Sequence, residues 1–237
     1  FDTGNNNISC SSGFNYSGTG TRTLTLGTST ITLTGGSWTM TTSTGLTFNG
    51  GSSTISMTSR NATFTGGGLT YNIVSVTATG GGGITFLSAN TFTTLTIRPS
   101  GNGAITVGAD QSVSGLFTVD NNTSAASNAG LLAGGSSTGV FTKGSARTIS
   151  AGSVSLANTT FADIVGAGAA TWTGTNIGDG GGNSNITFTT PVTRYWVDTN
   201  GGSWQTTASW STTSGGASGA TIPLPQDTAI FDANSIT

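Results

Sequence analysis

Asp163 and Asp179 are the residues whose type and spacing come closest to an acid–base pair. Glycan hydrolysis needs two carboxylates roughly 5 to 10 Å apart on one face, and the 16 residues from 163 to 179 could place these two on adjacent turns of a coiled chain. All eight acidic residues are Asp, and without Glu or His few groups could act as a general acid near neutrality. We therefore expect these aspartates to stabilise turns through their side-chain oxygens, and we expect that the chain is not an enzyme.

Residues for a metal or cofactor site are equally scarce. Cys10 is the single cysteine and His is absent, so neither a disulfide within the chain nor a metal cluster of Cys and His can form. The segments 178–183 (GDGGGN) and 198–202 (DTNGG) resemble calcium loops, but neither has the spacing or the number of oxygen ligands that calcium requires. We predict ordinary turns there, a small buried apolar role for Cys10, and no metal or cofactor.

Four aromatic residues gather in a short segment near the C-terminal end, namely Tyr195, Trp196, Trp204 and Trp210. Such a group could form a platform on which sugar rings stack, or a contact for a protein partner. Large aromatic side chains each bury roughly 150–250 Å² and more often close the core of a small module. We prefer the interpretation as core packing, with contact to a cell-surface glycan or partner as the alternative.

Thr-x-Thr pairs at 23/25, 30/32 and 39/41 could present hydroxyl groups to ice or another ordered surface. A flat array needs one pair per turn of a coil, whereas these pairs follow one another after only 7 and 9 residues. They cannot all lie on one face, so we expect them to be solvent-facing threonines of β-strands.

The composition argues against several classes of protein. Charged residues make up 6% of the chain, against roughly 25% in ordinary globular domains. The six basic residues are scattered and the net charge is −2, so we do not expect nucleic-acid binding. No apolar run reaches the ~18 residues of a membrane-spanning helix. Low charge with abundant Thr, Ser and Asn favours an extracellular location.

Hydrophobic alternation predicts many short β-strands. In 21–40 (TRTLTLGTSTITLTGGSWTM), Leu24 and Leu26 alternate with threonines, as do Ile31 and Leu33, and glycines separate the two pairs. Similar segments of about 20 residues follow, and a unit this short must stack on its neighbours to bury its apolar face. We predict an all-β fold, a right-handed parallel β-helix (a solenoid) with rungs of about 20 residues. The alternative is a Greek-key β-sandwich.

The character of the sequence changes after Phe188. Pro191 and the pair Pro223/Pro225 bracket a segment that contains three of the five tryptophans. We place a boundary near 189–193. Residues 1–189 are predicted to form the β-helix, and residues 190–237 a small Trp-rich β module that leads into a next unit.

The segment RYWVDTNGGSWQTTASWS, followed by IPLPQDTAIFDANS, resembles a module that recurs in repetitive β-helical, adhesin-like surface proteins of bacteria and in phage tail-fibre or virion proteins. The matching residues are Tyr195, Trp196, Val197, Trp204, Trp210, Pro225, Asp227, Phe231 and Asp232. A Gly-Gly is common in that module where Asp198 and Thr199 stand here. The stretches 64–97 and 161–188 are similar to the rungs and to the closing segment of such proteins. The resemblance implies a large surface-exposed protein that extends, adheres or builds a fibre, and it says little about activity.

The two ends of the chain are similar in sequence. FDTGNNNIS (1–9) and AIFDANSIT (229–237) share Phe-Asp, a small residue, and then Asn, Ile and Ser or Thr. This similarity suggests that the chain is one unit of a series. The end-to-end seam between units would then lie at Phe1, Asp2, Phe231 and Asp232, and the units would be joined either covalently in tandem or by self-association.

We therefore expect a non-enzymatic structural unit of an extended extracellular or virion fibre that assembles by end-to-end stacking of β-strands. One alternative is an adhesin or receptor-binding module that recognises surface glycans through the tryptophan cluster. A less favoured alternative is a tail-spike-like polysaccharide depolymerase.

Overall fold

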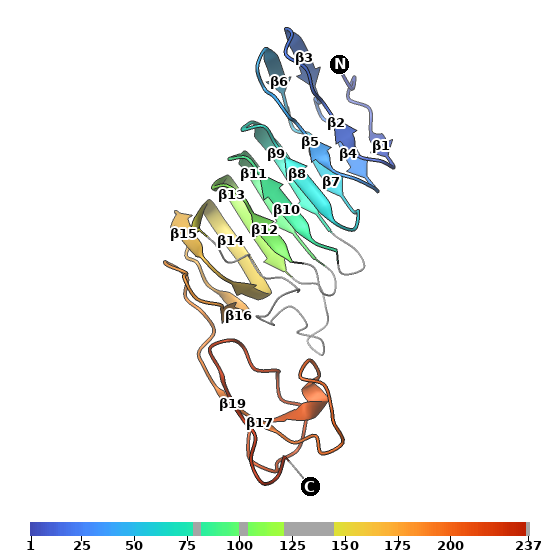
Figure 1. Cartoon of the computed structure of the whole chain (residues 1–237). Coiled ribbons are helices and arrows are strands. Elements are labelled where there is room, and N and C mark those ends of the chain that lie inside the picture. The colour runs from blue at the N-terminus through green and yellow to red at the C-terminus, as the bar shows by residue number, and fades with distance from the viewer. Residues whose placement is uncertain (78–81, 100–103, 121–144, 236–237) are drawn as a thin grey trace.

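The computed structural model describes residues 1–77, 82–99, 104–120 and 145–235, and its regular structure is almost entirely β (Figure 1). Strands make up 48% of the structure and helix makes up 1%. The elements are β1 (Ile8–Cys10), β2 (Phe14–Asn15), β3 (Arg22–Thr25), β4 (Thr30–Leu33), β5 (Trp38–Thr39), β6 (Leu46–Asn49), β7 (Thr54–Met57), β8 (Ala62–Thr65), β9 (Thr70–Val76), β10 (Ile84–Leu87), β11 (Thr91–Ile97), β12 (Ile105–Val107), β13 (Gln111–Asp120), β14 (Arg147–Phe161), β15 (Ile164–Gly168), β16 (Gly174–Asp179), β17 (Thr193–Trp196), the 3-10 helix η2 (Thr207–Ser209), β18 (Trp210–Ser211) and β19 (Thr228–Ile230).

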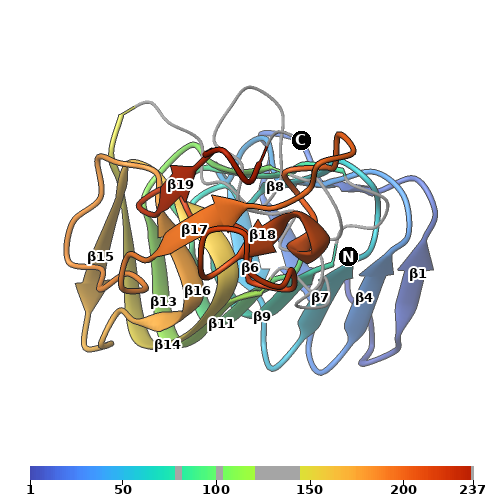
Figure 2. The ribbon, with the colours of Figure 1, turned by 90° about the horizontal axis from the view of Figure 1, so that it is seen from below.

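From β1 to β16 the chain coils into a parallel β-solenoid of about six turns. Its largest sheet, called here the long sheet, joins β1, β4, β7, β9, β11, β13, β14 and β15 in that order, with β16 also paired to β14. Figure 2 shows β1, β4, β7, β9 and β11 of this sheet side by side. A second sheet joins β2, β5, β8, β10 and β12, and β3 pairs with β6.

All strand pairs described in the solenoid are parallel. This pairing confirms the predicted parallel β-helix. It excludes the β-sandwich, whose Greek-key strands are antiparallel.

Residues that pair on successive strands of the long sheet give the length of each turn. Ile8 pairs with Ile31 and Ile31 with Ile55, so the first turns span 23 (31 − 8) and 24 (55 − 31) residues. Val74 pairs with Leu95, which makes a later turn 21 (95 − 74) residues long. The predicted rung of about 20 residues is thus too short for the first turns, because these turns carry additional strands, β3 and β6.

Inside the solenoid, residues at equivalent positions stack in columns along the axis. One column of the long sheet contains Cys10, Leu33, Met57, Val76, Ile97, Val119 and Leu156. On the second sheet the rings of Phe14, Trp38, Phe64 and Phe86 stack, with centroids 4.5, 6.3 and 5.8 Å apart in turn. Alternate residues of a strand face opposite sides, so the threonines between these apolar residues face outward. The core is therefore continuous from turn to turn.

Glycine and buried amides shape the corners between the sheets. Gly51 has φ +56°, and a methyl group there would lie 2.3 Å from the carbonyl oxygen of Gly27 on the preceding turn. At another corner, Asn90 Nδ2 donates to Gln111 Oε1 (3.3 Å), and Gln111 Nε2 donates to the carbonyl oxygen of Ser88 (2.8 Å). Both amides are buried, and a buried polar group is stable only when it is hydrogen-bonded in this way.

After Phe188 the chain leaves the solenoid and forms a small separate sheet. Strand β17 pairs antiparallel with β18 and parallel with β19. Trp210, Ile222 and Leu224 form a hydrophobic cluster of its own, distinct from the solenoid cluster that ends at Ile186 and Phe188. The two clusters lie on either side of the boundary predicted at 189–193. Figure 1 places this sheet at the C-terminal end of the solenoid, beyond β16.

Candidate functional site

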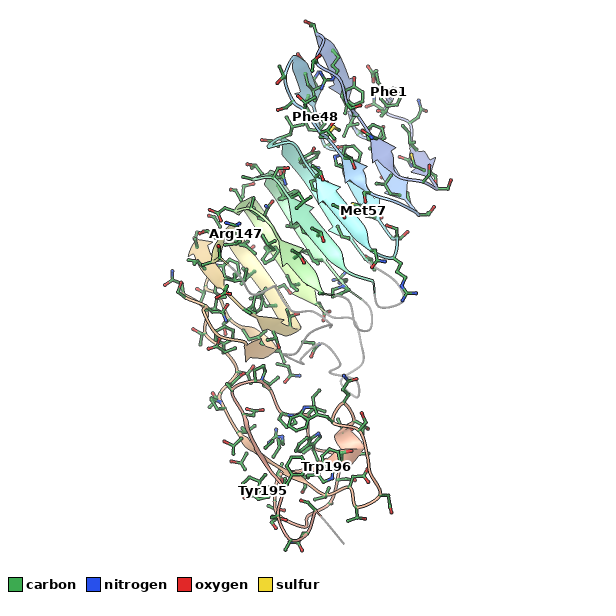
Figure 3. All side chains as sticks on the ribbon, in the orientation of Figure 1. Phe1, Phe48, Met57, Arg147, Tyr195 and Trp196 are labelled. Carbon is green, nitrogen blue, oxygen red and sulfur yellow. The ribbon has the colours of Figure 1, made fainter. Side chains whose placement is uncertain are left out.

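The predicted aromatic group occupies the centre of the C-terminal sheet. Tyr195 and Trp196 lie on β17, and Trp196 pairs with Trp210 of β18 (Figure 3). Trp204 comes from the loop before η2, and its ring meets that of Trp210 edge to face at 4.6 Å. Trp196 meets Trp210 edge to face at 5.2 Å. The structure therefore brings the three tryptophans together, whereas no ring contact to them is found for Tyr195 in the described part of the chain.

Burial decides what this cluster can do. Trp210 is fully buried, while Trp196 and Trp204 are half-buried. Trp210 Nε1 donates to the carbonyl oxygen of Trp204 (2.8 Å), and Phe231 stacks on Trp196 at 5.4 Å. The rings pack mainly against one another, so the cluster has the geometry of a small hydrophobic core with Phe231 at its edge.

A polar joint connects the cluster to the solenoid. Gln226 Oε1 accepts from the backbone N–H of Asp179 (2.9 Å), and Gln226 Nε2 donates to the carbonyl oxygens of Ile177 (3.2 Å) and Thr189 (2.9 Å). Beside it, Pro225 packs so closely on Gly178 that a Cβ at Gly178 would lie 2.7 Å from Pro225 Cδ. The sequence analysis missed Gln226; its only signal was the departure from a Ser/Thr-rich background directly after Pro225.

The two similar chain ends form similar local turns. Asp2 Oδ1 accepts from the N–H of Gly4 (2.8 Å), and Asp232 Oδ1 accepts from the N–H of Asn234 (2.9 Å). Phe1 is 59% exposed and Phe231 is 55% exposed, which makes them the two most exposed large apolar side chains described. The Phe-Asp pair thus presents an exposed ring before an Asx turn at both ends.

No described residue covers the outer side of the solenoid's first turn, which is called here the open first turn. Strands β1 and β2 are the last strands of their sheets, and no described residue pairs with their outer edges. Ile8, Cys10 and Phe14 are only half-buried. Their partners one turn further on, Ile31, Leu33 and Trp38, are at most 1% exposed. Cys10 was predicted to be buried and is half-buried in the described structure, because no described residue covers this side of the first turn.

The candidate carboxylates act within turns. Asp163 and Asp179 lie on adjacent turns, since the N–H of Asp163 donates to the carbonyl oxygen of Gly181, two residues after Asp179 (3.0 Å). Asp179 Oδ1 accepts from the N–H of Gly181 (2.9 Å) and from Asn183 Nδ2 (2.7 Å). The carboxylate of Asp163 lies against Gly182, where a Cβ would come 1.8 Å from its Oδ1. Each carboxylate is thus next to backbone or amide groups that shape the turn.

The second loop considered for calcium is also a turn. Asp198 Oδ1 accepts from the N–H of Asn200 (2.9 Å), and Asp198 Oδ2 accepts from the Ser209 hydroxyl (3.4 Å). Among the described residues, no group of three or more His, Cys, Asp or Glu side chains is placed to hold a metal ion.

The Thr-x-Thr pairs lie in different sheets, as the sequence spacing requires. Thr23 and Thr25 are on β3, Thr30 and Thr32 on β4, and Thr39 on β5. The pair on β4 nevertheless belongs to an array that the sequence analysis missed. Thr32 pairs with Ser9 on β1 and Ser56 on β7, so hydroxyl residues from distant parts of the sequence stack on the long sheet.

No helix in the described ranges is long and apolar enough to cross a membrane. Comparisons of the chain with protein-family models, with curated proteins and with solved structures each return no match.

Proposed function

We propose that the chain is a non-enzymatic structural unit of an extended extracellular, cell-surface or virion fibre, in which units join end to end. The observation that carries this proposal is the open first turn. Strands β1 and β2 have outer edges that no described residue pairs with, and Ile8 and Phe14 beside them are half-buried. An unpaired strand edge backed by apolar side chains is a surface on which another β-structure can add.

The two ends of the unit differ, which sets the direction of assembly. The C-terminal end of the solenoid is covered by the Trp-rich module, which Gln226 fastens to Ile177 and Thr189. The module of one unit therefore meets the open first turn of the next, with Phe231/Asp232 and Phe1/Asp2 at the seam. A contact between two different surfaces extends into a filament unless the rotation between successive units closes a ring.

Sedimentation velocity over a concentration series tests self-assembly of separate chains. We expect association that grows with concentration and that Phe1→Lys weakens, because the joint would have to bury an unpaired charge. Leu87→Lys is the matched control, since Leu87 is 42% exposed on β10, away from either end. A chain that stays at 23.4 kDa at every concentration contradicts self-assembly. A denatured mass far above that value in the native source would instead mean that the units are joined covalently.

Glycan recognition by an adhesin-like module is the second candidate function. It is favoured by one observation, a buried Trp204 Nε1 that has no hydrogen-bond partner among the described residues. The test measures binding of Trp204→Ala to surface polysaccharides. Loss of binding with the fold intact supports this function, whereas loss of the fold assigns the residue to the core.

A further inference from the structure

The outer face of the long sheet carries an unbroken column of hydroxyl groups. Residue by residue along the pairing register, the column runs through Ser9, Thr32, Ser56, Ser75, Thr96, Thr118 and Ser155. Every member is Ser or Thr, although the turns between them differ in length. Figure 1 shows that the strands which contribute them follow one another along the solenoid.

A second column lies beside the first, two residues earlier on each strand. It contains the outward residues Thr30, Thr54, Ile73, Thr94, Leu116 and Ser153. Neither column contains a charged residue. The nearest charges on these strands are Arg98, directly after β11, and Asp120, the last residue of β13. Both columns are therefore uncharged; the first consists of hydroxyl residues alone, and the second combines hydroxyl residues with Ile73 and Leu116.

The hydroxyls of the first column are not used by the protein itself. Within the part of the chain that the structure describes, none of the seven donates or accepts a side-chain hydrogen bond. Thr118 is 7% exposed, and its hydroxyl, which makes no side-chain hydrogen bond within the described residues, still reaches the surface. The branched Cβ of threonine restricts its χ1 rotamer, so the hydroxyls of Thr32, Thr96 and Thr118 have fewer orientations open to them than the four serine hydroxyls of the column.

We infer that this face pairs with the same face of a second copy, with the two solenoid axes antiparallel. Each hydroxyl can both donate and accept a hydrogen bond, so an array of hydroxyls is complementary to itself. The spacing between successive hydroxyls, about 4.8 Å, is the same in a second copy. Any other partner would need groups repeated at this spacing. The absence of charge removes the repulsion that identical charged faces would suffer.

The dimensions make this a weak contact for a single pair. Seven rungs at ~4.8 Å and strands of roughly four to seven residues give a face of about 29 Å by 13–23 Å, or about 400–670 Å² per copy. Stable interfaces bury about 800 Å² per partner. The face also lacks aromatic or arginine anchors, which dominate tight interfaces.

Repetition would strengthen the contact. In a fibre of end-to-end units the same weak contact recurs once per unit, and linked contacts gain affinity far beyond that of each one. The lateral pairing does not depend on the end-to-end joint for its geometry, because it uses the side of the solenoid. The two contacts can therefore be tested separately.

Thiol crosslinking detects such a weak contact directly. In a Cys10→Ser background, Ser75→Cys places one thiol at the middle of the column, where the two-fold axis of an antiparallel pair brings a residue next to its own copy. Facing sheets lie about 10 Å apart, beyond the reach of a disulfide, so a short bifunctional maleimide is the probe. We expect Ser75→Cys to give dimers at least about tenfold faster than Thr85→Cys, which lies on β10 of the second sheet. The rate of labelling by a monofunctional maleimide corrects for thiol accessibility.

Cysteines at the two ends of the column test whether the two copies pair with antiparallel axes. Ser9→Cys alone and Ser155→Cys alone should crosslink poorly, whereas an equimolar mixture of the two should form mixed dimers. Equal rates for Ser75→Cys and Thr85→Cys after correction would overturn the pairing, as would a failure of the mixed Ser9→Cys and Ser155→Cys sample to form dimers faster than either variant alone. Inhibition of ice recrystallisation by the protein without any crosslink would also overturn it, in favour of an ordered water lattice as the partner.

Discussion

The indole Nε1 of Trp38 donates a 3.2 Å hydrogen bond to the hydroxyl of Tyr71 across the interior of the solenoid. The Tyr71 hydroxyl in turn donates to the carbonyl oxygen of Gly66 (2.9 Å), and both rings are at most 1% exposed. The bond links the second sheet, which contains Trp38, to the long sheet, which contains Tyr71. One hydroxyl of the long sheet therefore satisfies two buried polar groups, Trp38 Nε1 and the carbonyl oxygen of Gly66.

Replacing Tyr71 by Phe should destabilise the solenoid. The ring would keep its packing, but Trp38 Nε1 and the carbonyl oxygen of Gly66 would lose their partner in a dry core, at a cost of about 1–3 kcal/mol for each group left unsatisfied. Tyr16→Phe is the control, because the Tyr16 hydroxyl bonds to the carbonyl oxygen of Thr23 at an exposed site. Urea unfolding followed by circular dichroism measures both. Equal midpoints for the two variants would contradict the assigned role.

The same tyrosine should make the stability depend on alkaline pH. Burial raises the pKa of the Tyr71 phenol, despite the hydrogen bond from Trp38. A raised pKa means that the folded state favours the neutral phenol, so its contribution is complete below the ordinary pKa of about 10 and is lost as pH rises above that value. We expect the urea midpoint of the wild type to fall more steeply than that of Tyr71→Phe between about pH 10 and 12. Parallel falls would show that Tyr71 contributes nothing to this loss.

Gly51 should tolerate no side chain. Its φ of +56° costs an L-residue about 1–2 kcal/mol, and a Cβ would also press on the Gly27 carbonyl oxygen at 2.3 Å. Gly51→Ala should therefore lower the free energy of unfolding by more than about 2 kcal/mol. Gly20→Ala is the control, since a Cβ there meets no atom within 4 Å. Thermal unfolding compares the two, and equal midpoints would contradict the account of this corner.

Period-2 alternation was sufficient to predict the architecture, because inward Leu, Ile, Val and Phe must stack if a short turn is to bury them. It could not predict which residues stack. Ile55 to Val74 spans 19 residues (74 − 55), whereas Phe117 to Val154 spans 37 (154 − 117). A fixed repeat therefore fails to align Ser75 with Ser56 or Ser155 with Thr118, and the hydroxyl column is visible only from the pairing register.

The contacts of the Trp-rich segment were also only partly predictable from the sequence. Its tryptophans were predicted to pack in a core, with contact to a glycan or partner as the alternative, because rings of that size more often close the core of a small module. Nothing in local sequence connected Gln226 with Ile177, since the contact joins residues 49 positions apart through a single amide.

Gln226→Ala should loosen the module from the solenoid. The change removes the side-chain hydrogen bonds to the Asp179 N–H and to the Ile177 and Thr189 carbonyl oxygens. We expect faster limited proteolysis between 180 and 192 with little change in the unfolding of the solenoid. Gln205→Ala is the control, because it removes the same side chain away from this joint. Unchanged cleavage in Gln226→Ala would mean that Pro225 packing alone holds the module.

Trp210→Ala should unfold the module and spare the solenoid. Trp210 is fully buried, and truncation of a buried tryptophan costs about 3–5 kcal/mol, a large loss for a cluster whose other buried members are Ile222 and Leu224. The solenoid has its own core, so proteolysis should leave a resistant fragment that ends near residue 189. Val192→Ala is the control, because Val192 is 40% exposed. Survival of the module in Trp210→Ala would mean that its fold depends on Gln226 and the solenoid surface more than on its aromatic core, and it would make the tryptophans available for binding.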